Sequence, residues 1–144
     1  MKVSMQIEHK ITVSATPDIL FRIYEDVANW HTWDPDTKRA VLKGPFEPGS
    51  KGKLTPAKGN TVPMRVTEVV ANRSFTVESK IPFFRMVFEH ELIPQAGGTE
   101  VIHRVKLSGP LLMIIGKMLS RQIDAGLPIT LQNLKQLAEA KSVA

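Results

Sequence analysis

The last quarter of the chain carries its longest stretch of helical periodicity. Between residues 111 and 138 apolar residues recur at steps of three and four, and charged residues fall largely on the other sides. Gly109-Pro110 marks the start, because a proline in the first turn of a helix loses no hydrogen bond there. Pro128 removes one backbone donor inside the pattern and is expected to bend the helix. So long a helix with one apolar side needs a broad apolar partner.

Most of the remaining chain alternates between apolar and polar residues, which is typical of half-buried β-strands. The first such segment covers residues 2–14. Two short helical segments follow, one opened by Thr16-Pro17 and one ending at Pro35. Turn residues then separate six further strands, expected at residues 38–43, 51–57, 61–70, 74–80, 84–93 and 99–108. The pattern predicts an antiparallel meander that covers the long helix, in a single domain spanning residues 1–144.

Composition indicates an ordinary globular protein, with 42% hydrophobic and 23% charged residues among 144. No apolar run approaches the roughly eighteen residues that span a membrane. The first ten residues alternate and lack the apolar stretch of a signal peptide. We therefore expect a cytoplasmic protein without stable membrane insertion. The formal net charge is +5, but the basic residues are scattered, which argues against nucleic acid as a partner.

The sequence has no cysteine, which excludes disulfides and thiolate chemistry. It also lacks the motifs of metalloproteases, serine hydrolases and phosphate-binding loops. No cofactor and no metal site is therefore predicted. The oligomeric state is left open.

Four short motifs lie near the starts and ends of the expected elements. They are Ala15-Thr16-Pro17-Asp18 with Leu20-Phe21, Asp26 leading to Trp33-Asp34-Pro35, Pro48-Gly49-Ser50-Lys51-Gly52, and Leu131-Gln-Asn-Leu134-Lys-Gln-Leu137. With this order of elements, the chain resembles the START-like (SRPBCC) superfamily, and within it the small bacterial polyketide cyclase/dehydrase and lipid-transport branch. The resemblance implies an α+β helix-grip fold: a seven-stranded antiparallel sheet wrapped around a long C-terminal helix, with two short helices after the first strand. It also implies a cavity between sheet and helix that holds an apolar or amphipathic small molecule.

Strand alternation indicates which side chains would line such a cavity. Flexible methionines and aromatic residues lie on the inward faces, and a tryptophan is expected at the mouth. The candidate ligand-binding residues are Trp33, Met64, Phe84, Met86, Phe88, His90, His103 and Met113. Each apolar member could instead be ordinary core.

Three histidines occupy apolar faces of strands, where valine or leucine would be usual: His9, His90 and His103. If the first strand pairs with the last, and the last with the one before it, His90 lies opposite His103 and His9 reaches the same level. Converging imidazoles offer general acid–base chemistry or metal ligation. Alternatively, each is a hydrogen-bonded polar group in a wet cavity.

Three functions remain open. The leading hypothesis is binding of a hydrophobic or amphipathic small molecule, such as a lipid, isoprenoid or aromatic metabolite. The second is a polyketide cyclase- or dehydratase-like enzyme that uses His90, His103 and His9 as acid and base. The third is a protein-interaction module of the cochaperone kind, which an exposed apolar patch on the long helix or at Trp30 and Trp33 would favour.

Overall fold

A computed structural model of the protein describes residues 4–143, and each expected element is present there with small shifts at its ends. The elements are β1 (Ser4–Val13), α1 (Pro17–Glu25), the 3-10 helix η1 (Val27–Thr32), β2 (Thr37–Lys43), β3 (Lys51–Pro56), β4 (Val62–Val70), β5 (Ser74–Ile81), β6 (Phe84–Gln95), β7 (Gly98–Ser108) and α2 (Leu112–Ser142). The expected first strand residues Lys2 and Val3 lie outside the described part of the chain.

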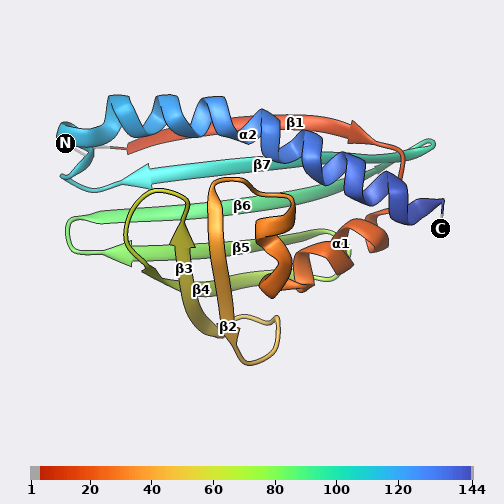
Figure 1. Ribbon diagram of the computed structural model, residues 1–144, viewed down its shortest axis with the longest axis horizontal. Helices are drawn as coiled ribbons and strands as arrows, with labels where there is room; N and C mark the ends of the chain where they lie inside the picture. The colour runs from red at the N-terminus through yellow and green to blue at the C-terminus, as the bar shows by residue number, and fades with distance from the viewer. Residues whose placement is uncertain (1–3, 144) are drawn as a thin grey trace.

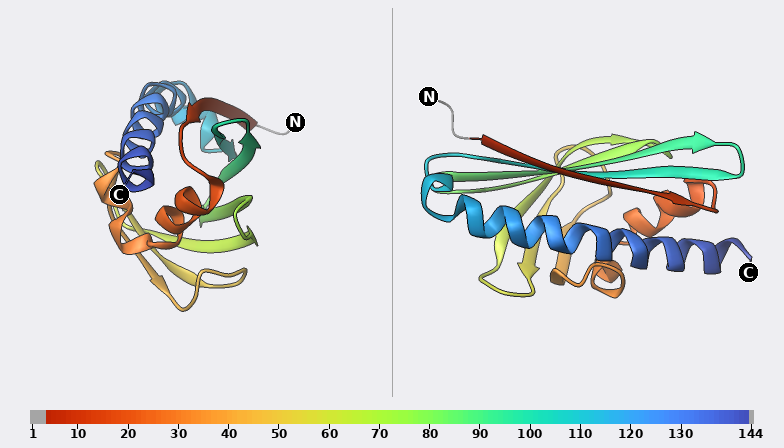
Figure 2. Two further views of the ribbon diagram at one scale, coloured as in Figure 1. Left: turned by 90° about the vertical axis from the view of Figure 1, so that its right-hand side faces the viewer. Right: turned by 90° about the horizontal axis from the view of Figure 1, so that it is seen from above.

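Within residues 4–143, seven strands form one antiparallel sheet in the order β1-β7-β6-β5-β4-β3-β2 (Figure 1). Each strand from β2 to β7 pairs with its neighbour in the chain, as consecutive hairpins do, and β1 pairs with β7. Seen end-on in Figure 2, the sheet curves and α2 lies along its open side. The fold is therefore the helix-grip arrangement, with the helix held by the curved sheet.

Helix α2 is longer than predicted, since it continues past residue 138 to Ser142. It runs through Pro128 without a break, and Figure 1 shows it changing direction near its middle. Gly116 lets the helix approach β1 closely, because a Cβ atom there would lie 3.1 Å from Met5 Sδ. None of the helices within residues 4–143 combines the length and apolarity that crossing a bilayer requires.

The interior is divided into two apolar clusters along the length of α2. The larger one joins α1 and η1 to the sheet and to the second half of α2, and includes Leu20, Phe75 and Leu134. The smaller one lies under the first half of α2, around Leu107 and Leu112. The two short helices thus cover only one end of the sheet, and the candidate site residues are distributed between the two ends.

Candidate functional site

A row of aromatic side chains crosses the inner face of the sheet at one level. His9 on β1 lies opposite His103 on β7, His103 lies opposite His90 on β6, and His90 lies opposite Phe75 on β5. The expected pairing of the three histidines is confirmed by this register. The row runs from the edge strand into the middle of the sheet.

Tyr24 of α1 meets this row and forms a cluster with two of its imidazoles. Its hydroxyl lies 2.8 Å from Nε2 of His103. The ring of His90 stacks on Phe75 with ring centres 3.9 Å apart, and its centre is 4.6 Å from that of His103. Nδ1 of His90 lies 3.2 Å from the carbonyl oxygen of Phe75. Because a carbonyl only accepts, we assign the His90 proton to Nδ1, which leaves Nε2 with a free lone pair.

Burial determines the ionisation of this cluster. Desolvation lowers the pKa of His103 well below its usual value, and the neighbouring His90 lowers it further. Desolvation also lowers the pKa of His90 from 6.5 to about 4, against the opposing effects of the hydrogen bond to Phe75 and the charge of Glu89. Burial raises the pKa of Tyr24. At neutral pH the cluster therefore holds two neutral imidazoles and a protonated phenol.

His9 does not join the cluster. Its Nε2 lies 2.6 Å from Oδ1 of Asp124 on α2, so the ring turns toward the helix instead of along the sheet. Among residues 4–143, no group of three or more His, Asp or Glu side chains is arranged to hold a metal ion. The expected convergence of three imidazoles is therefore wrong, because α2 lies over β1 and supplies a carboxylate partner for the edge histidine.

The other candidate lining residues fall in different surroundings. Met64 and Phe84 are buried in the two apolar clusters, and Met86 and Phe88 are half-buried beside the smaller one. The expectation for Met113 is wrong, because 77% of this residue is exposed. The residue before it is buried against the sheet, and each step along a helix turns by about 100°, so Met113 points away from the interior.

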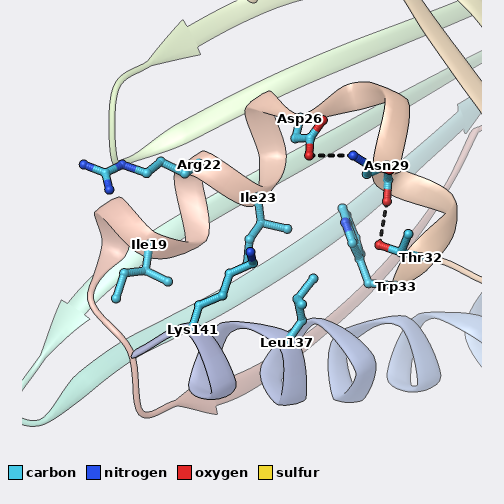
Figure 3. Close-up of a pocket in the computed structure, with 9 residues that line it drawn as sticks. All are labelled: Ile19, Arg22, Ile23, Asp26, Asn29, Thr32, Trp33, Leu137 and Lys141. Carbon is cyan, nitrogen blue, oxygen red and sulfur yellow. Dashed lines mark hydrogen bonds between the residues drawn. The ribbon is translucent and has the colours of Figure 1, made fainter. Parts of the chain in front are cut away.

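A pocket of about 460 Å³ lies between α1, η1 and the last turns of α2 (Figure 3). It is lined by Ile19, Arg22, Ile23, Asp26, Asn29, Thr32, Trp33, Leu137 and Lys141. In Figure 3, Lys141 extends from α2 toward α1. Trp33 is the member of this set that the sequence had indicated. Since all of these residues lie outside the strands, the pocket is at one end of the helix and not between the helix and the sheet.

Trp33 stands between this pocket and the aromatic cluster. Only 4% of the residue is exposed, and its ring centre lies 6.3 Å from that of His103 and 6.0 Å from that of Tyr24. Its Nε1 is buried and has no hydrogen-bond partner within the described residues. By contrast, Nε1 of Trp30 donates to the carbonyl oxygen of Tyr24 at 2.8 Å. An unpaired buried donor is unusual in a folded protein.

Asp34 anchors the segment that carries Trp33. Its carboxylate accepts hydrogen bonds from Thr37 Oγ1 at 2.8 Å and from Thr130 Oγ1 of α2 at 3.1 Å. Burial raises the pKa of this carboxyl group. The bonds tie the end of η1 to α2, which holds the indole of Trp33 at the back of the pocket.

A family model described as polyketide cyclase/dehydrase and lipid transport matches residues 4–139. The chain belongs to this family. The match covers most of the sequence, including the sheet, the short helices and nearly all of α2. It supports a ligand-binding or cyclase role. No curated protein matches the sequence.

Solved structures of the same fold include enzymes. The di-domain ARO/CYC StfQ from the steffimycin biosynthetic pathway has a TM-score of 0.80 at 15% identity, over 99% of this chain and 53% of that one. The Zhui aromatase/cyclase from Streptomyces sp. R1128 has a TM-score of 0.79 at 16% identity, over 96% of each chain. A point mutant of norcoclaurine synthase from Thalictrum flavum has a TM-score of 0.76 at 14% identity, over 99% of each chain. The chain spans about half the length of the di-domain protein. At these identities the likeness establishes the fold alone.

Apart from Trp33, the residues that line the pocket were not predicted from the sequence as a site. Ile23 and Leu137 follow the helical period of ordinary core positions, and Lys141 lies beyond the predicted helix end. One signal was available. Leu137 and Lys141 are four residues apart and therefore lie on the same face of α2. An apolar side chain and a positive charge are thus adjacent at the end of this helix.

Proposed function

We propose that the protein binds a small amphipathic molecule, with an apolar body and an acidic head, in the pocket beside Trp33. The observation that carries this proposal is the buried Nε1 of Trp33, which has no partner within residues 4–143. A buried donor without a partner costs on the order of 1–3 kcal/mol, so a ligand whose binding shifts the indole enough to bring an acceptor to Nε1 would recover this free energy. The family description, which includes lipid transport, agrees with such a ligand.

The lining of the pocket matches both ends of an amphipathic ligand. Ile19, Ile23 and Leu137 offer apolar contact to its body. Arg22 and Lys141 offer positive charge, and Lys141 makes no ion pair with any described residue. An acidic head beside Lys141 would form a charge-assisted hydrogen bond, which is among the stronger polar interactions in proteins.

A matched pair of ligands tests the proposal. Dodecanoic acid and dodecanol share their alkyl chain, and tryptophan fluorescence reports their binding. We expect a saturable change in fluorescence with both ligands and tighter binding of the acid. Trp33→Phe removes the indole that lines the pocket and reports binding, and should abolish most of the signal. Trp30→Phe is the control, because Trp30 does not line the pocket and its variant should keep the response.

The cation is tested separately by Lys141→Met and Lys141→Arg. Loss of one charge-assisted hydrogen bond should weaken binding of the acid about tenfold, equivalent to about 1.4 kcal/mol, and leave the alcohol nearly unchanged. Lys141→Arg should restore the preference for the acid. No saturable response to either ligand, or a response that survives Trp33→Phe in full, would contradict the proposal.

A second candidate function is a cyclase- or dehydratase-like reaction at the Tyr24–His103–His90 cluster. It is favoured by the 2.8 Å contact between the Tyr24 hydroxyl and Nε2 of His103. A neutral imidazole can accept a proton from a substrate, and both imidazoles of the cluster are neutral at physiological pH. Native mass spectrometry of the molecule that co-purifies with the protein separates the two candidates. A polycarbonyl chain would favour the enzyme, and a fatty acid would favour the carrier.

A further inference from the structure

Four large apolar side chains are exposed together at the end of the molecule opposite the pocket. Phe83, in the turn between β5 and β6, is 75% exposed. On the first turns of α2, Met113, Ile114 and Met118 are 77%, 82% and 60% exposed. We call these four residues the apolar corner. Single exposed apolar residues are common on protein surfaces, but a contiguous group marks an interaction site.

The two segments of the apolar corner are held together by the backbone. The amide of Leu111, just before α2, donates to the carbonyl oxygen of Phe83 at 3.1 Å. Phe83 has a positive φ of 65°, which is uncommon for a residue other than glycine, asparagine or aspartate. In Figure 1, the β5–β6 turn and the start of α2 lie at the same end of the long axis. The protein thus presents a bulky phenyl group at a strained turn, beside the apolar start of a helix.

The surroundings of the apolar corner are positively charged. Residues 79–88 contain Lys80 and Arg85, residues 112–123 contain Lys117 and Arg121, and neither segment contains an acidic residue. Arg85 is paired with Glu78 at 2.6 Å. Lys80, Lys117 and Arg121 make no ion pair with another described residue. Three free cations therefore flank the exposed apolar side chains.

We propose that the apolar corner docks on the surface of an anionic phospholipid bilayer. The side chains of the apolar corner would enter the boundary between lipid head groups and acyl chains. The flanking Lys80, Lys117 and Arg121 would contact lipid phosphates. Each basic residue near such a surface strengthens the binding, and salt weakens this contribution. A bilayer accepts apolar side chains that project from the end of a molecule, whereas a protein partner must offer a matching hollow. The binding is peripheral.

This docking is independent of the proposed ligand pocket. Ile114 and Leu137 are separated along α2 by roughly 35 Å, at about 1.5 Å per residue. A variant that removes the pocket cation, Lys141→Met, should therefore bind vesicles as the wild type does. Failure of vesicle binding and failure of ligand binding can be observed separately.

Vesicle flotation tests the docking surface. Vesicles of phosphatidylcholine alone are compared with vesicles that also contain phosphatidylglycerol, at low and at physiological salt. We expect the wild type to float with the anionic vesicles only, and less so at higher salt. The double variant Ile114→Ser/Met118→Ser should reduce binding about tenfold or more, because two apolar side chains are lost. The double variant Lys117→Glu/Arg121→Glu should reduce it at least as strongly.

The control is Ile129→Ser, on the same helix but away from the apolar corner. Ile129 is 55% exposed, so its variant changes a comparable apolar surface, and it should bind like the wild type. Circular dichroism of each variant should match that of the wild type, since all substituted side chains are exposed. The proposal is overturned if the wild type does not bind anionic vesicles at low salt, or if both double variants bind as it does. It is also overturned if the wild type is a dimer that Ile114→Ser/Met118→Ser converts to a monomer, because a second copy would then occupy the surface.

Discussion

Acidification is expected to destabilise the protein through its interior histidines. The pKa of His90 is 6.5 in an unfolded chain and about 4 in the folded protein, because desolvation opposes its charged form. Between these two values the unfolded chain binds a proton that the folded protein does not. The free energy of unfolding therefore falls as the pH falls. The contribution of His90 to the free energy of unfolding is fully present above pH 6.5 and is lost by about pH 4.

The size of the effect follows from the same values. The difference between 6.5 and about 4 corresponds to about 3 kcal/mol, at about 1.36 kcal/mol per pH unit. Between about pH 7 and about pH 5, protonation of His90 in the unfolded chain alone should lower the free energy of unfolding by about 2 kcal/mol. His103 acts in the same direction, because its pKa is also lowered by burial. With a urea m-value of about 2 kcal/mol/M, a loss of about 2 kcal/mol shifts the unfolding midpoint by about 1 M.

Urea unfolding followed by circular dichroism measures this shift. Measurements above about pH 5 keep ordinary carboxylates ionised in both the folded and the unfolded protein. Asp34 acts in the opposite direction, because its raised pKa favours proton uptake by the folded protein. Comparison with His90→Gln cancels this contribution, since Asp34 is present in both proteins. His31→Gln is the control, because His31 is exposed on η1.

The wild type and His31→Gln should lose stability in parallel on acidification, and His90→Gln should lose less. Two results would refute the reasoning. One is a wild-type midpoint that stays constant between about pH 7 and about pH 5. The other is a His90→Gln midpoint that moves as far as that of the wild type.

Two further predictions concern the interior. Tyr24→Phe and His103→Leu should each cost on the order of 1–3 kcal/mol, because each leaves a buried polar partner unsatisfied. The double variant should cost clearly less than the sum in urea unfolding, and additivity within about 0.5 kcal/mol would exclude coupling between the two side chains. Met64→Ala should destabilise the protein by about 2–5 kcal/mol, since Met64 is buried in the core. Met113→Ala should change the free energy of unfolding by less than about 0.5 kcal/mol, and equal effects of the two substitutions would contradict the assigned positions.

Periodicity was sufficient to predict the elements and the level of the histidine row. A strand shows one face every second residue, so His9, His90 and His103 had to lie on inner faces once their strands were assigned. A hairpin meander then leaves few choices of register, because a slip of one residue would turn every apolar side chain outward. The pairing of His90 with His103 followed from the hairpin between β6 and β7 alone.

The periodicity of the sequence does not predict which side chains of different elements contact each other. Nothing in the sequence pattern indicates that Asp124 of α2 meets His9 at the edge strand, or that Tyr24 of α1 meets His103. These contacts depend on where the helices cross the sheet, which is set by close approaches such as that at Gly116. Met113 was misplaced for a related reason. It lies beside the buried stripe of the helix in sequence, and only packing decides how wide that stripe is.

The indole of Trp33 lies next to both candidate sites. Trp33 lines the pocket, and its ring centre lies 6.0 Å from that of Tyr24 and 6.3 Å from that of His103. In our proposal, a ligand in the pocket lies beside Trp33 and Lys141, which line it, and not beside His90 or His103, which do not. If a substrate were to reach His103 from this pocket, the indole would have to turn aside, and the hydrogen bond from Thr130 of α2 to Asp34, the residue after Trp33, would oppose this movement. The buried position of Trp33 therefore agrees with our proposal that the protein holds a ligand, and a reaction reached through this pocket would need a substrate whose binding moves this side chain.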